Sequence, residues 1–154
     1  MDLGDMITQN GILPCLKVSS KKQVLQELSA QAAKLTGTDQ RDIFDILLQR
    51  ERLGSTGVGN GVAIPHGKLS HLEHIVSIFA KLDHPVNFES IDGQPVDLVF
   101  LLLAPESSGA DHLKALARIS RLLREPTALE KLRSATSVSA LYSVLTEPAA
   151  SHAA

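Results

Sequence analysis

The sequence of 154 residues has little of the chemistry on which several large classes of protein depend. One cysteine cannot form an internal disulfide, so we expect a reducing compartment, the cytoplasm. Aromatic residues make up only 3%, which disfavours a stacking surface for single-stranded nucleic acid. A formal net charge of −2 argues against the basic surface of nucleic-acid-binding domains. No apolar run reaches the roughly 18 residues of a membrane span, and Asp2 and Asp5 stand where a signal peptide would be basic.

What the sequence does contain is typical of one folded domain. The hydrophobic fraction of 44% and the charged fraction of 21% are close to globular averages. We therefore predict a single domain over residues 1–146, followed by a flexible tail of small residues at 147–154. Six histidines stand out against the few aromatic residues and direct attention to imidazole chemistry.

Hydrophobic periodicity and capping residues predict the order of the secondary-structure elements. Helices are expected at 20–37, 39–54, 110–123, 126–133 and 137–145. Strands are expected at 62–64, 75–82 and 96–103, with 12–18 as an edge strand or extended segment because it contains Pro14. The continuous apolar character of 96–103 favours a central strand covered on both faces. The fold class predicted is α/β (α+β), a single layered domain with a mixed sheet flanked by helices.

The segment 50–67 holds the residues most suggestive of chemistry. His66 stands between Pro65 and Gly67, and Gly67 would let the backbone pass close to whatever His66 carries. The plain alternative is a turn histidine without a role. Residues 54–61 form a glycine-rich loop, whose backbone amides could bind an anion together with hydroxyl donors. We predict phosphate contacts there from Ser55, Thr56 and Gly57. The loop lacks the lysine of a nucleotide-binding P-loop and the Rossmann spacing.

This segment resembles the signature of a known family. An acidic residue, Glu51, precedes Val58-Gly59 and then the run Val62-Ala63-Ile64-Pro65-His66-Gly67. That pattern is similar to enzyme IIA domains of the fructose/mannitol class of the bacterial phosphoenolpyruvate-dependent phosphotransferase system, and most similar to their nitrogen-regulatory branch. The resemblance continues through FLLLAP at 100–105 and DHLKALARISRLLRE at 111–125, and spans residues 5–145.

The resemblance implies a fold like that of mannitol-type IIA domains and roles for three residues. His66 falls on the family's phosphorylated histidine, His112 on its second active-site histidine, and Arg50 on its active-site arginine. A neutral imidazole nitrogen is a competent nucleophile, and an arginine offers a fixed fork of donors for phosphate oxygens. Taken singly, His112 could be a surface residue at a helix start, and Arg50 a solvated charge at a helix end.

The implied function is that of a phosphoryl carrier rather than a turnover enzyme. His66 would accept phosphate from an HPr-like phosphocarrier, such as its nitrogen-branch counterpart NPr, and its phosphorylation state would regulate sensor kinases or potassium transporters. Two alternatives stay open: a sugar-specific IIA component that passes phosphate to a separate IIB protein, and a binding module of the same fold without phosphohistidine. We expect no nucleic-acid partner and no membrane insertion.

We expect no cofactor and no metal, because the spacing of His66, His71 and His74 is not a standard zinc pattern. His84 and His152 are expected at the surface, and Cys15 as a small buried hydrophobe. For docking of the phosphocarrier we expect an exposed apolar patch near the site. Its candidate residues are Leu53, Val58, Leu69 and Leu113.

Overall fold

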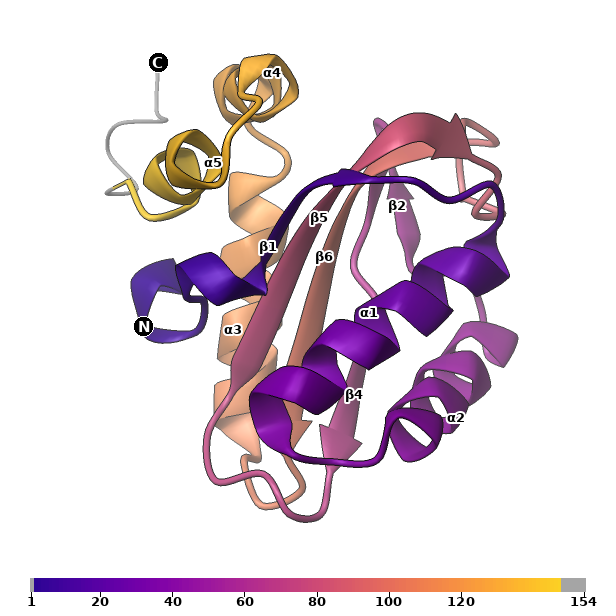
Figure 1. Ribbon diagram of the computed structural model, residues 1–154, viewed down its shortest axis with the longest axis vertical. Coiled ribbons are helices and arrows are strands. Elements are labelled where there is room, and N and C mark those ends of the chain that lie inside the picture. Colours follow the sequence, from indigo (N-terminus) through magenta and orange to yellow (C-terminus); the bar gives the residue numbers. More distant parts are fainter. Residues whose placement is uncertain (1, 148–154) are drawn as a thin grey trace.

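The computed structural model describes residues 2–147, which form a sheet with helices on both faces (Figure 1). The strands are β1 Ile12–Leu16, β2 Gly57–Gly59, β3 Val62–Ala63, β4 His66–Leu69, β5 Val76–Val86 and β6 Val96–Pro105. The helices are η1 Leu3–Asp5, η2 Gln9–Gly11, α1 Lys21–Thr36, α2 Gln40–Arg52, α3 Ala110–Leu122, α4 Pro126–Ser134 and α5 Val138–Leu145, where η marks a 3₁₀ helix.

The sheet is mixed and is built around β6. Its order is β1-β5-β6-β3-β2, and β4 also pairs with β6. Strands β3 and β4 run parallel to β6, whereas β5 runs antiparallel to it. β6 is buried along nearly its whole length, which confirms the predicted central strand. β1 lies at the edge, pairing only with β5, as the proline in it predicted.

Strands β3 and β4 keep one register against β6 although two residues separate them. Val62 lies opposite Leu98 and His66 lies opposite Leu102, so the offset between partners is the same in both pairs. The segment between them, 64–65, stays beside β6 because the Pro65 carbonyl accepts a hydrogen bond from the Leu102 amide (3.0 Å). Side-chain alternation therefore continues through the interruption.

The two faces of the sheet bury separate hydrophobic cores. α1 and α2 cover one face and pack on residues such as Ala63, Leu69 and Val99. α3, α4, α5 and the N-terminal η1 cover the other face, where Ile64 and Phe100 lie (Figure 1). Figure 1 shows α1 and α2 in front of the sheet and α3 behind it, so the layered α/β prediction is confirmed.

Helix starts follow the sequence signals. The Ser20 hydroxyl accepts from the Gln23 amide (3.1 Å) at the start of α1, and Asp39 accepts from the Arg41 amide (2.8 Å) at the start of α2. α1 ends at Gly37, whose φ of +75° is the left-handed conformation that favours glycine. These caps fix where α2 begins and so which residues its last turn presents to the sheet.

The structure corrects some expectations and extends others. Cys15 is exposed, not buried, because alternation along the edge strand β1 turns it to solvent. The glycine-rich segment expected as a loop contains β2, and β4 was not expected as a strand. Most of the expected tail, 148–154, lies outside the described residues, while Glu147 forms an ion pair with Lys131 (3.3 Å). Among the described residues, no helix combines the length and apolarity that crossing a membrane requires.

Candidate functional site

His66 opens β4 with its ring orientation fixed by a hydrogen bond. Its Nδ1 lies 2.9 Å from the Ile64 carbonyl oxygen. Because a carbonyl oxygen only accepts, we assign the ring proton to Nδ1. The other nitrogen, Nε2, then carries a free lone pair in the neutral ring. The alternation that continues through 64–65 places residues 64 and 66 on one face, which allows this bond.

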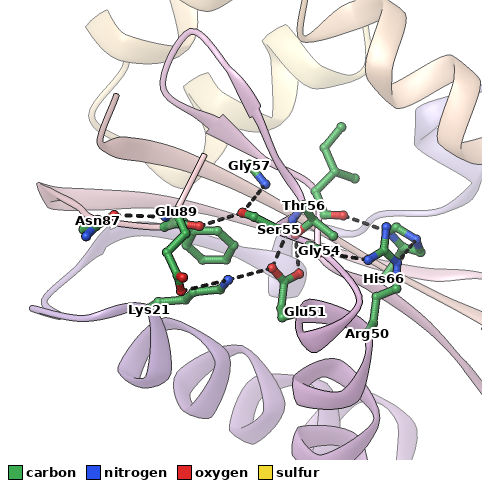
Figure 2. A network of polar contacts seen from close by, with 12 residues as sticks. Lys21, Arg50, Glu51, Gly54, Ser55, Thr56, Gly57, His66, Asn87 and Glu89 are labelled. Carbon is green, nitrogen blue, oxygen red and sulfur yellow. Dashed lines mark hydrogen bonds and ion pairs between the residues drawn. The ribbon is translucent and has the colours of Figure 1, made fainter. Parts of the chain in front are cut away.

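Arg50 reaches His66 from the last turn of α2. Its Nε donates to His66 Nε2 (3.2 Å), and its Nη1 donates to the Gly54 carbonyl (2.9 Å) (Figure 2). The first contact agrees with the assignment of Nε2 as the unprotonated nitrogen. α2 packs on the face of the sheet opposite α3, so Arg50 passes the sheet edge that β4 forms. The two contacts hold the guanidinium directly over the candidate reacting nitrogen.

His112 completes the group from the first turn of α3. It is buried, with 8% of its surface exposed, and its ring centroid lies 5.7 Å from that of His66. Its buried Nδ1 has no hydrogen-bond partner among residues 2–147. An unpartnered polar atom inside a protein is costly, which points to an added group that it would bind. The structure thus brings together all three residues named from the family pattern.

Both histidines are held in the neutral form. Burial lowers the pKa of His66 most strongly, and Arg50 adds to this, while the bond to Ile64 and the charge of Glu51 oppose it. Burial also lowers the pKa of His112, with smaller contributions from His66 and Lys68. At neutral pH the Nε2 lone pair of His66 is therefore available for reaction.

In the structure the three predicted loop ligands are engaged in hydrogen bonds within the protein. The Ser55 hydroxyl donates to the Phe88 carbonyl (2.6 Å) and accepts from the Gly57 amide (3.0 Å). The Thr56 hydroxyl and amide both donate to the carboxylate of Glu51. Figure 2 shows Ser55, Thr56, Gly57 and Glu51 with these hydrogen bonds. A phosphate role for Ser55, Thr56 and Gly57 would require these internal bonds to break.

Glu51 is a buried charged residue whose contacts sequence reasoning missed. It is 7% exposed and forms an ion pair with Lys21 (3.1 Å). The sequence signal that could have found it is helical spacing, since Ile43, Leu47 and Glu51 follow one another at intervals of four on the buried face of α2. A carboxylate on such a face needs partners, and the adjacent loop supplies them.

The exposed apolar residues agree in large part with the predicted docking patch. Leu53 is 85% exposed, Leu113 66% and Val58 52%. The prediction that Leu69 belongs to the exposed patch was wrong. Leu69 is buried in the core beneath α1 and α2, because it lies on the same side of β4 as Gly67. Ile91, which is 87% exposed, was not anticipated. Its amide bonds to the carbonyl of Gly57, so it lies next to the glycine-rich segment.

The other histidines lie apart from this group. His71, His74 and His84 are exposed, and His152 lies outside the described residues. Within residues 2–147 no three histidine, cysteine or carboxylate side chains are gathered closely enough to hold a metal ion.

Comparison with known proteins defines the class. Residues 5–147 match the family model of the phosphoenolpyruvate-dependent sugar phosphotransferase system, EIIA 2, and the chain belongs to this family. It is 62% identical over 153 residues to a nitrogen regulatory protein of Bradyrhizobium diazoefficiens, a match that spans 99% of this chain and 100% of that protein. The resemblance to the nitrogen-regulatory branch is thereby confirmed.

Solved structures agree on the fold. The nitrogen regulatory protein IIA-Ntr of Neisseria meningitidis is similar with a TM-score of 0.89 and 33% identity, over 94% of this chain and 99% of that one. The IIA mannitol protein of Escherichia coli is similar with a TM-score of 0.76 and 21% identity, over 90% of this chain and 97% of that one. The predicted likeness to mannitol-type IIA domains is therefore confirmed at the level of fold.

Proposed function

We propose that this protein is a phosphoryl carrier of a nitrogen-type phosphotransferase system, which accepts a phosphoryl group on Nε2 of His66. One observation carries the proposal: the bond from Nδ1 to the Ile64 carbonyl leaves Nε2 unprotonated, in contact with Arg50, on a ring that neighbours the buried ring of His112. The relatives named nitrogen regulatory protein support the choice of branch.

The transfer step needs no rearrangement of the imidazole. The lone pair of Nε2 forms a bond to phosphorus in line with the P–N bond of a donor phosphohistidine, which breaks and returns its electron pair to the donor ring. Nδ1 keeps its proton on the Ile64 carbonyl. Because donor and acceptor are both imidazoles, the transfer is nearly balanced and reversible.

Arg50 and His112 stabilise the transferred group. Arg50 now donates to Nε2, so it moves from the nitrogen to the phosphoryl oxygens as the phosphate arrives. The unpartnered Nδ1 of His112 supplies a second donor in the neutral tautomer that carries its proton on Nδ1. The amides in the first turn of α3 add a partial positive charge on the same side.

The donor is an HPr-like phosphocarrier, such as NPr, that docks on the exposed apolar patch. Leu53 follows Arg50 at the end of α2, and Leu113 follows His112 in α3, so both flank the reacting residues in sequence. Exposed apolar side chains rimmed with polar groups are typical of protein interfaces. Val58 extends the patch along β2.

The output is regulation of partner proteins by the phosphorylation state of His66. A phosphoryl group brings about −1.5 to −2 charges to an apolar surface, which is enough to block or create an interface. Sensor kinases and potassium transporters are the proposed targets, and the cytoplasmic location stays a prediction. Pull-down with wild type and with His66→Ala, read by mass spectrometry, would identify the partners that sense the phosphate.

The direct test is incubation with phosphoenolpyruvate and the two general upstream phosphotransferase proteins. Intact mass should show one acid-labile phosphoryl group. Phosphorus NMR should show a single phosphorus chemical shift, that of a phosphate bound to Nε2 of an imidazole. The label should be lost in His66→Ala and kept in His84→Ala, which removes an exposed histidine elsewhere. A label that persists in His66→Ala would overturn the assignment, and no label on wild type would favour the binding-module alternative.

A sugar-specific role is the second candidate, since the matching family is described as a sugar phosphotransferase system. It predicts that phosphorylated protein loses its phosphate when a candidate IIB protein is added. Retention of the phosphate with the IIB proteins of the same cell would leave regulation as the output.

A further inference from the structure

We propose that Glu51 is a positioning residue for phosphoryl transfer, whose carboxylate acts through Thr56 to hold His66 and whose backbone carbonyl acts through Gly54 to hold Arg50 in their reactive arrangement. The inference deepens the proposed function and rests on it. Glu51 touches neither reacting group, yet its contacts lead to each of them by a separate route.

The network is centred on the buried carboxylate of Glu51, which is bonded to Thr56 and Lys21. Glu51 Oε1 accepts from the Thr56 amide (3.0 Å) and from Lys21 Nζ (3.1 Å), and Oε2 accepts from the Thr56 hydroxyl. Lys21 also lies over the ring of Phe88, 4.8 Å from its centroid. Charge-assisted hydrogen bonds in a buried setting are the strong ones, so Thr56 is tightly fixed (Figure 2).

One route runs from Thr56 to His66 through the backbone of Ile64. The Thr56 carbonyl accepts from the Ile64 amide (3.0 Å), and the Ile64 carbonyl accepts from His66 Nδ1. The carbonyl that selects the tautomer of His66 therefore belongs to a peptide strand tied to Thr56. If Thr56 shifts, the acceptor for Nδ1 shifts with it, and the proton can move to Nε2, which blocks the nucleophile.

The other route runs to Arg50 through Gly54. The Gly54 amide donates to the Glu51 backbone carbonyl (3.1 Å), and the Gly54 carbonyl accepts from Arg50 Nη1. Glu51 thus holds the turn at 53–56 from both ends, by its carbonyl at Gly54 and its carboxylate at Thr56. This turn holds Nη1 of Arg50 through the Gly54 carbonyl, while Nε of the same guanidinium donates to His66.

Lys21 makes the buried charge tolerable and links the network to α1. Its ammonium group is the partner that offsets burial of the carboxylate, since an unpaired buried charge is strongly destabilising. The Nζ atom of Lys21 also lies 3.7 Å from Oε1 of the exposed Glu89.

A purely structural network would affect folding alone. A positioning network would also set the tautomer of His66, and the tautomer can be measured.

The test compares Thr56→Val, which keeps the shape of the side chain and removes the hydroxyl, with Thr56→Ser, which keeps the hydroxyl. Glu51→Gln removes the charge. The matched control is Ser29→Ala, which removes a buried hydroxyl that bonds to the Leu25 carbonyl within α1 (2.7 Å), away from the site. Each variant is assayed by proton–nitrogen correlation NMR of the His66 ring and by steady-state phosphorylation with varied phosphocarrier.

We expect the Nδ1–H tautomer to dominate in wild type, Thr56→Ser and Ser29→Ala, and a mixture with Nε2–H in Thr56→Val and Glu51→Gln. In these two variants kcat should fall about tenfold while KM changes less than about twofold, because displacement of a reacting group by about 1 Å is costly and the docking surface is unchanged. Restoration by serine separates positioning from general stability.

Wild-type tautomer and kcat in both Thr56→Val and Glu51→Gln would overturn the proposal. If Glu51→Gln does not fold, Thr56→Val decides by the same readouts. The tautomer is measured on unphosphorylated protein, so a failure of His66 to accept phosphate would overturn the proposed function and leave this measurement interpretable.

Discussion

Gly67 in β4 packs directly against Ile46 in α2, with no room for a side chain at the glycine. A Cβ built on Gly67 would lie 2.6 Å from Cγ2 of Ile46. The helix therefore lies close on the strand, and this close approach brings Arg50, one turn farther along α2, to His66. The sequence suggested that Gly67 makes room for a group on His66, but the neighbour it accommodates is a helix on the other face.

Gly67→Ala should push α2 away from β4 and separate Arg50 from His66. We expect a loss of about 1–3 kcal/mol in the free energy of unfolding, as for overpacked cores, and slower phosphorylation. Ile46→Ala in the same chain should restore part of both. Gly4→Ala is the control, since its nearest neighbour would lie at 3.8 Å. Urea unfolding and transfer rates measure the effects, and a fully active Gly67→Ala would contradict this account.

Arg50→Lys should keep the positive charge and lose the paired contacts that the guanidinium makes with His66 and Gly54. A lysine ammonium cannot contact His66 Nε2 and the Gly54 carbonyl at once through a planar fork, as Arg50 does. We expect phosphorylation to slow by about 100- to 1,000-fold, comparable to the loss of one transition-state donor. Arg52→Lys, an exposed neighbour on the same helix, should transfer at the wild-type rate. Equal rates in the two variants would remove the special role of Arg50.

His112→Ala should fold and transfer slowly. The substitution removes a buried imidazole whose Nδ1 has no partner among residues 2–147, so the cost to stability is modest and the cost to transfer is large. Rapid-quench phosphorylation should show a rate reduced by about 100- to 1,000-fold. His71→Ala, which removes an exposed histidine apart from the site, is the control. Unchanged kinetics in His112→Ala would exclude it as a phosphate ligand.

Stability should fall as the solution becomes mildly acidic. Burial lowers the pKa of His66 and of His112 in the folded protein, so just below the ordinary pKa of about 6.5 the unfolded chain binds protons that the folded chain does not. The contribution is complete above that value and is lost as the pH falls toward the folded-state pKa values. Urea unfolding between about pH 7.5 and pH 5 should show a shallower decline in His66→Gln/His112→Gln than in wild type. Parallel declines would contradict the lowered pKa values.

Leu53→Asp and Leu113→Asp should weaken docking without affecting the fold. Both leucines are largely exposed, so stability should change by less than about 0.5 kcal/mol. We expect the KM for the phosphocarrier to rise about tenfold or more, because a charge on an apolar contact must be desolvated, while kcat stays close to wild type. Gln26→Asp, on the exposed side of α1, is the control. An unchanged KM would place the docking surface elsewhere.

Local signals and the family pattern predicted much of this molecule. Caps such as Ser20 and Asp39 and the buried run of β6 follow from residue type and spacing. The family pattern singled out Arg50, His66 and His112, which the structure brings together. What could not be predicted depends on contacts between distant segments. The Ser55 hydroxyl is held by Phe88, 33 residues away, and Leu69 is buried only because helices pack over β4. The partners of a hydroxyl, or the face that a short strand buries, are set by tertiary packing.

The equal register of β3 and β4 makes chain length between them a property of the site. Because side chains alternate, one residue inserted between Ala63 and His66 would turn the imidazole to the face covered by α1 and α2, away from His112. Removal of one residue would do the same. The pair 64–65 therefore acts as a spacer of fixed length, and the chain can vary its side chains more readily than its number of residues.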